Sequence, residues 1–104
     1  MHYVIIATHT ADICPTANAK TRDLTMQMGP DVPRIAEKAG VTIIAGPYVS
    51  REHVSVAIVE AKTGEDLDQF LMESRLPMWN SVKVLPSVTM EEGMQEIQTL
   101  PTIF

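Results

Sequence analysis

The residues best suited to chemistry lie just after the first apolar segment of the chain. His9 is followed five residues later by Cys14, the only cysteine of the sequence. Cys14 precedes Thr16, a candidate helix N-cap, and a thiol near a helix amino terminus has a lowered pKa. We therefore take Cys14 as the best candidate for a reactive side chain. The alternative is that Cys14 fills space beneath the loop, since free cysteines are often buried.

The same two residues could hold a metal ion. Thiolate and imidazole groups are zinc ligands, and the set would have to be completed by His2, His53 or Asp12. The spacing of His9 and Cys14 fits no recognised zinc motif. We therefore assign no metal and no other cofactor, and a metal-binding protein that uses His9 and Cys14 is kept as an alternative.

A second candidate pair follows from the alternation of side chains along strands. Residues 3, 5, 7 and 9 share one face of the first predicted strand, and residues 54, 56, 58 and 60 share one face of the third. If these strands are parallel neighbours, His9 and Glu60 meet at one end and His2 and His53 at the other. A carboxylate beside an imidazole suits proton transfer. The alternative is that His9 and Glu60 are rim residues that face water.

Three further residues are candidates for ligand binding: Tyr48, Trp79 and Lys83. Aromatic rings with a polar group often orient a flat ligand at the mouth of a cavity. The same residue types at a sheet edge also serve as dimer-interface packing, which is the alternative. The five glycines are dispersed and form no phosphate loop, and no serine hydrolase signature is present.

The composition argues against several classes of protein. The chain has 8 basic and 13 acidic residues, a net charge of -5, and no basic cluster that could neutralise phosphates, so we expect no nucleic-acid partner. No stretch has the roughly 18 to 20 apolar residues of a membrane span, and no basic n-region precedes the first apolar run. A single cysteine is consistent with a reducing compartment. We expect a cytoplasmic protein without a membrane partner.

Four segments have the composition of β-strands. We predict strands at residues 2–8, 41–45, 53–61 and 81–85. The second of them bends at Gly46 and Pro47 before Tyr48, and a strand with a proline belongs at a sheet edge. Pro86 is expected to end the last strand.

The remaining segments predict helices. Residues 16–28 form a helix that Gly29 and Pro30 interrupt, and it resumes at residues 31–39 to end at Gly40. Thr63 caps a clearly amphipathic helix, whose inner face carries Leu67, Phe70, Leu71 and Ser74. A short helix follows at residues 89–97.

This order predicts one domain over residues 1–104, an α+β ferredoxin-like β-α-β-β-α-β fold with an additional C-terminal helix. We expect a four-stranded antiparallel sheet with helices on one face, except that the first and third strands lie side by side and parallel at its centre. These central strands are apolar on both faces. The same face of a second subunit is then expected to cover the open side in a twofold homodimer.

The chain resembles the dimeric α/β-barrel superfamily, which includes muconolactone isomerase-like and antibiotic-monooxygenase-like proteins. The resemblance rests on the strand order, on residues 41–47 followed by residues 53–61, and on residues 73–86, where a helix leads through Trp79 into an edge strand. It implies a cavity between the sheet and the helices or between two sheets. It transfers no catalytic residue, because members of a fold differ in chemistry.

These observations predict a small dimeric protein that binds a compact organic ligand. As an enzyme it would act by proton transfer, as an isomerase, or as a cofactor-free oxygenase, with His9, Cys14 and Glu60 as catalytic residues. The alternatives are a non-catalytic ligand-binding or stress-associated dimer, and the metal-binding protein described above. The residues alone do not decide whether the chain is an enzyme.

Overall fold

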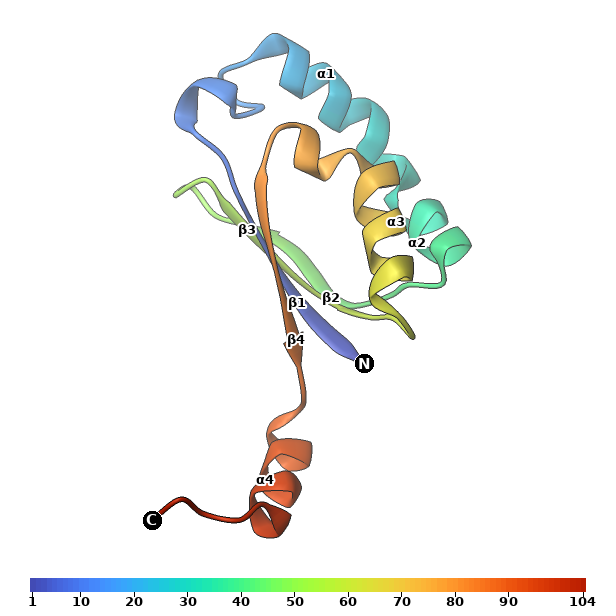
Figure 1. Ribbon diagram of the computed structural model, residues 1–104. Coiled ribbons are helices and arrows are strands. Elements are labelled where there is room, and N and C mark those ends of the chain that lie inside the picture. Colours follow the sequence, from blue (N-terminus) through green and yellow to red (C-terminus); the bar gives the residue numbers. More distant parts are fainter.

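The β-branched runs of the chain form one sheet in the computed structural model, which describes residues 1–104 (Figure 1). The strands are β1 (His2–Thr8), β2 (Thr42–Val49), β3 (Val54–Glu60) and β4 (Ser81–Ser87). Their order in the sheet is β2-β3-β1-β4, and every neighbouring pair is antiparallel. The α+β, ferredoxin-like fold predicted from the sequence is confirmed.

The predicted parallel pairing of the first and third strands is wrong. β1 and β3 are antiparallel, with His2 opposite Glu60 and Thr8 opposite Val54. The cause is topological: the helical crossover makes β1 run in the same direction as β2, and the tight β2–β3 connection reverses β3. The start of β1 therefore lies beside the end of β3, whereas the prediction placed it beside the start of β3.

Four α-helices accompany the sheet: α1 (Ala19–Met28), α2 (Val32–Ala39), α3 (Gly64–Ser74) and α4 (Met90–Thr99). The break between α1 and α2 and the cap at Gly40, whose φ is 77°, agree with the prediction. So does the cap of α3, where the Thr63 side chain accepts a hydrogen bond from the backbone N–H of Asp66. The predicted cap at Thr16 is wrong, because α1 begins three residues later and Asn18 caps it.

The prediction that Pro86 ends the last strand is also wrong, since β4 continues to Ser87. β4 lies at the edge of the sheet and pairs only with β1. A proline lacks the N–H of a ladder hydrogen bond, but an edge strand can leave that position unpaired.

The core lies between the sheet and α2 and α3, which cover one face (Figure 1). Tyr3, Ile5 and Val59 point from the sheet toward Ile35, Leu67, Phe70 and Leu71 of these helices, and all of them are buried. The inner-face residues expected on α3 are confirmed, except that Ser74 is only half-buried. None of the helices has the length and apolarity that a membrane span requires.

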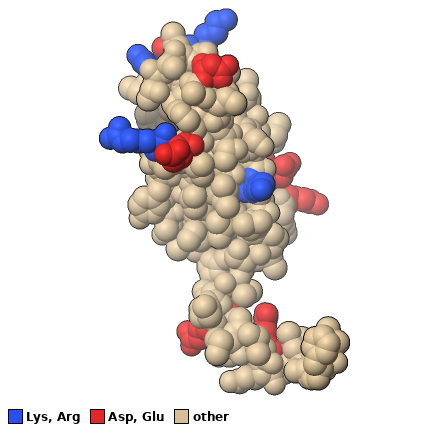
Figure 2. Space-filling model, turned by 90° about the vertical axis from the view of Figure 1, so that its left-hand side faces the viewer, with Lys and Arg blue, Asp and Glu red and all other residues tan.

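No element covers the other face of the sheet, which we call the open face. It carries the alternate residues of each strand, among them Val4, Ile6, Val56, Ile58, Lys83 and Leu85. Leu85 is 45% exposed and Val56 is 36% exposed. Figure 2 views the molecule from this side and shows a largely uncharged surface with only scattered charged side chains. The predicted apolarity of both faces is therefore present in the fold.

Candidate functional site

The antiparallel register brings two histidines together at one end of the sheet. Thr8 pairs with Val54 in the last step of the β1–β3 ladder, so the next residue on each side is His9 or His53. The backbone N–H of His9 donates a hydrogen bond of 3.2 Å to the carbonyl of His53. Their rings meet edge to face, with centroids 5.2 Å apart.

The β2–β3 turn holds His53 in a distinctive conformation. Its φ is 63°, in the left-handed region that few residues other than glycine adopt, although histidine is among those enriched there. The turn is closed by the N–H of Ser50, which donates to the carbonyl of Val54 at 2.8 Å. Backbone strain of this kind is often found at functional sites.

Cys14 comes to the same place from the loop between β1 and α1. A single 3₁₀ turn, Ala11–Ile13, folds this loop back, and the N–H of Cys14 donates to the carbonyl of Ala11 at 3.3 Å. The thiol is buried, with 8% of the residue exposed. Donor atoms of His9, Cys14 and His53 all lie within 4.8 Å of one another, and we call these three residues the His–Cys–His cluster.

The environment of Cys14 lowers the pKa of its thiol to about 6. The main cause is the hydroxyl of Thr16, which donates a hydrogen bond of 3.0 Å to Sγ, followed by the backbone N–H of Thr16 and the side chains of His9 and His53. A reactive thiol was predicted here from the amino terminus of a helix. The structure replaces that cause with a hydroxyl, because the helix begins five residues beyond Cys14.

Asn80 fixes the orientation of His9. The amide of Asn80 donates through Nδ2 to the carbonyl of Leu76 at 3.3 Å, which leaves its Oδ1 to accept from Nδ1–H of His9 at 3.0 Å. In the neutral form of this ring the lone pair is then on Nε2, which is buried and has no hydrogen-bond partner. A buried acceptor without a partner is costly, and Nε2 would gain a bond from any group that supplied one.

Trp79 also packs against His9, with ring centroids 5.0 Å apart. Trp79 and Asn80 follow a short 3₁₀ turn, Leu76–Met78, that joins α3 to β4. Sequence reasoning selected Trp79 as a ligand-binding residue and missed Asn80. Nothing in the spacing of Asn80 marks it, since it lies 71 residues from His9 in the chain.

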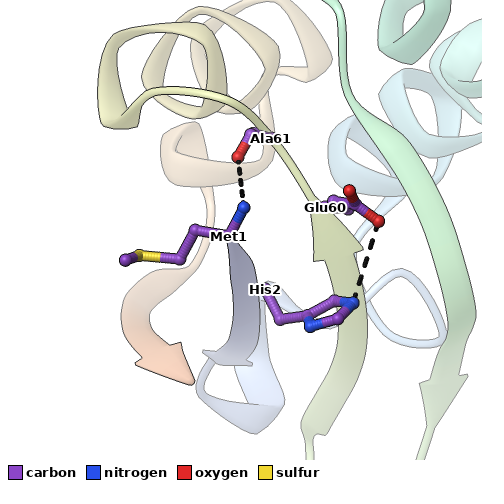
Figure 3. Close-up of polar contacts among 4 residues, drawn as sticks. All are labelled: Met1, His2, Glu60 and Ala61. Atoms are coloured by element: carbon purple, nitrogen blue, oxygen red, sulfur yellow. Dashed lines mark hydrogen bonds and ion pairs between the residues drawn. The ribbon is translucent and has the colours of Figure 1, made fainter. Parts of the chain in front are cut away.

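The predicted pairing of His9 with Glu60 is wrong. Glu60 lies at the opposite end of β3 and opposite His2 in the ladder, and its carboxylate Oε2 is 3.8 Å from Nε2 of His2 (Figure 3). Glu60 also belongs to the open face, whereas the alternate residues of β1 that precede His9 face the helices. The expected meeting of His2 and His53 fails for the same reason, which is the antiparallel register.

The predicted ligand-binding residues do not lie together. Tyr48 belongs to β2 and Lys83 to β4, which are the two opposite edge strands of the sheet. Both are exposed, and the exposed fraction of Tyr48 is 71%. Only Trp79 is near the His–Cys–His cluster. Asp12, considered as a further metal ligand, is exposed and is not part of the cluster.

A cavity of about 240 Å³ lies between the sheet and the helices. Its walls are mainly apolar and include Ile5, Met28, Val32, Ala57, Phe70 and Trp79. His9, Cys14 and Glu60 do not line it, so the predicted cavity is present but does not gather the predicted catalytic residues. Trp79 lines the cavity and also packs against His9.

The His–Cys–His cluster combines a thiol of low pKa, an unpaired imidazole nitrogen and a second imidazole. These groups are ligands for zinc and copper ions, and Oδ1 of Asn80 orients His9 from the position that a carboxylate or carbonyl oxygen usually takes beside a metal-bound histidine. A search of protein-family models and of curated proteins finds no match to the chain. The chemistry of the site is therefore argued from its geometry.

Proposed function

We propose that this protein binds one thiophilic transition-metal ion, Zn²⁺ or Cu⁺, through the His–Cys–His cluster. Two observations carry the proposal: Nε2 of His9 is buried without a hydrogen-bond partner, and a ring nitrogen of His9, a ring nitrogen of His53 and Sγ of Cys14 lie within 4.8 Å of one another. Metal binding thus replaces the organic ligand as the leading hypothesis. The alternative based on His9 and Cys14 gains His53 as its third ligand.

The donor set supports these ions for two reasons. A thiolate favours Cu⁺ and Zn²⁺ over harder ions such as Mg²⁺ and Ca²⁺, and imidazole suits both. With metal bonds of about 2.0–2.3 Å, two ligands of a tetrahedral ion lie about 3.5 Å apart, so donor atoms within 4.8 Å need only small side-chain rotations. The cluster provides three ligands, which leaves a fourth position for water or a substrate.

Metal uptake tests the proposal directly. We expect the purified chain, after chelator treatment and equilibration with Zn²⁺ or Cu⁺ under reducing conditions, to retain one ion per chain. The reason is that a thiol with a pKa of about 6 is mostly deprotonated at neutral pH and ready to bind. Elemental analysis after gel filtration measures the stoichiometry. Retention of less than a tenth of an equivalent of either ion would refute the proposal.

We also propose a second ligand, a compact apolar molecule, for the cavity beneath the helices. The cavity volume of about 240 Å³ and its apolar walls support this part of the original prediction. The resemblance to the dimeric α/β-barrel superfamily also supports this second ligand, because that resemblance implies a cavity between the sheet and the helices or between two sheets. Proton transfer by a His9–Glu60 pair is not retained, because His9 and Glu60 lie at opposite ends of the β1–β3 ladder.

Fluorescence of Trp79, the only tryptophan, reports on this cavity. We expect p-nitrotoluene to quench it saturably, beyond the quenching of free indole. An Ala57→Leu variant fills the cavity and should lose the saturable component, whereas Ala19→Leu, on the exposed first turn of α1, should keep it. Quenching that is linear and equal in all three proteins would count against the cavity as a binding site.

Finally, we propose that two copies of the chain pair in the cytoplasm. The proposal is supported by the apolar open face, since contiguous exposed apolar surface marks interaction sites. A reducing compartment would keep the Cys14 thiol available for the metal.

A further inference from the structure

The last 17 residues form an arm that leaves the body of the protein. We call residues 88–104 the C-terminal arm; it contains α4 and the tail that follows (Figure 1). Figure 1 shows α4 beyond the end of β4, away from α1, α2 and α3. The extents of the whole chain are 54, 30 and 19 Å, which reflects this projection. The arm therefore has no partner within its own chain.

The C-terminal arm has an exposed apolar surface that needs a packing partner. Met90, Met94 and Ile97 recur at the spacing of one helical face, and each is more than half exposed. Leu100, Ile103 and Phe104 continue this apolar surface into the tail and are also exposed. An isolated helix of 10 residues is marginal in water, so α4 needs packing on its apolar side.

The open face of the sheet is complementary to the arm. The arm carries three glutamates, Glu91, Glu92 and Glu96, and no lysine or arginine, as the lower part of Figure 2 shows. The open face carries the exposed cation of Lys83, opposite Ile6, among apolar side chains, whereas the carboxylate of Glu60 lies at the other end of this face beside His2. Ten helical residues span about 15 Å, which matches about three strand spacings of a sheet.

We propose that the C-terminal arm packs on the open face of a second copy of this chain, and that the two copies exchange arms around a twofold axis. The partner is a second copy because only Val88 and Thr89 separate β4 from α4, and Thr89 is extended. The helix is thus carried onward along β4 and not back over its own sheet. This inference rests on the proposed pairing of two copies and is independent of the metal site.

Cysteine cross-linking between two differently marked chains tests the exchange. Both chains carry Cys14→Ser; one also carries Ile97→Cys on the arm, and the other Val56→Cys on the open face. After co-refolding and mild oxidation we expect a covalent dimer on a non-reducing gel, because the two sulfurs belong to different copies. The matched control replaces Ile97→Cys with Glu92→Cys, on the opposite side of α4, and should give at least fivefold less covalent dimer.

Native mass measurement complements the cross-link. The unmodified chain should have the mass of two chains at micromolar concentration, and a Met94→Asp, Ile97→Asp variant should have the mass of one. A dimer that survives these substitutions, with no arm-to-face disulfide, would overturn arm exchange and leave pairing through the sheets. A monomeric unmodified chain would overturn both. A disulfide formed within one chain that carries both Val56→Cys and Ile97→Cys would show an arm folded on its own sheet and also overturn exchange.

Discussion

Replacing His53 with alanine should lower the affinity of the protein for Zn²⁺ by about 100-fold or more, whereas replacing His2 with alanine should leave it unchanged. Loss of an outer partner of a metal ligand alone costs about 10- to 100-fold in affinity, and loss of the ligand itself should cost at least the upper end of that range. His53 is one of the three members of the cluster.

His2 is the matched control because it is a partly buried histidine of the same sheet that does not belong to the His–Cys–His cluster. It lies opposite Glu60 at the far end of the β1–β3 ladder (Figure 3). Competition with a chromophoric chelator at constant pH measures both affinities. Equal affinities in the two variants would mean that the ion is bound elsewhere, and a loss in the His2 variant alone would point to the His2–Glu60 end of the sheet.

Replacing Gly46 with alanine should destabilise the fold by about 3 kcal/mol. Gly46 has a φ of 84°, and a left-handed conformation costs a residue with a Cβ about 1–2 kcal/mol. The added Cβ would also lie 2.7 Å from the carbonyl oxygen of Val56 and 3.2 Å from Cα of Ala57. Both contacts are with the backbone of β3, so the sheet itself must shift, at a further cost of about 1–3 kcal/mol.

Gly29 provides the control for this substitution. Its backbone is helical, with φ -52°, and no atom lies within 4 Å of a Cβ built there. Alanine at Gly29 should therefore be neutral or stabilise by about 0.5–1 kcal/mol, because it restricts the unfolded chain. Urea unfolding of both variants and the unmodified chain measures the difference. Similar stability of the Gly46 and Gly29 variants would show that β2 relaxes freely around Gly46.

The local features of the fold could be read from the sequence because they depend on neighbouring residues. The Thr63 cap, the break at Gly29 and Pro30, and the left-handed cap at Gly40 follow from side-chain hydrogen bonding and backbone freedom within a few positions. The cap of α1 was misplaced because Thr16 and Asn18 are both competent caps. The loop conformation selected Asn18 and left Thr16 to bind Cys14.

Strand direction does not follow from the residue pattern of a single strand; it follows from the order of the elements and from the connections between them. Side chains alternate with a period of two in parallel and antiparallel strands alike, so the pattern of β1 and β3 is the same for both. The direction determines which ends meet. For that reason the sequence singled out His9 and Cys14 by residue type but paired His9 with Glu60, whereas the antiparallel ladder brings it to His53.

The sequence by itself determined the fold class, the two-sided apolarity of the sheet and the presence of one cysteine and one histidine near the first strand. Only the tertiary structure decided which residues surround them. His53, Trp79 and Asn80 come from the β2–β3 turn and the α3–β4 connection, and contacts over such separations depend on how the sheet is threaded. Local propensities do not contain that information, because each segment would form the same element in either topology.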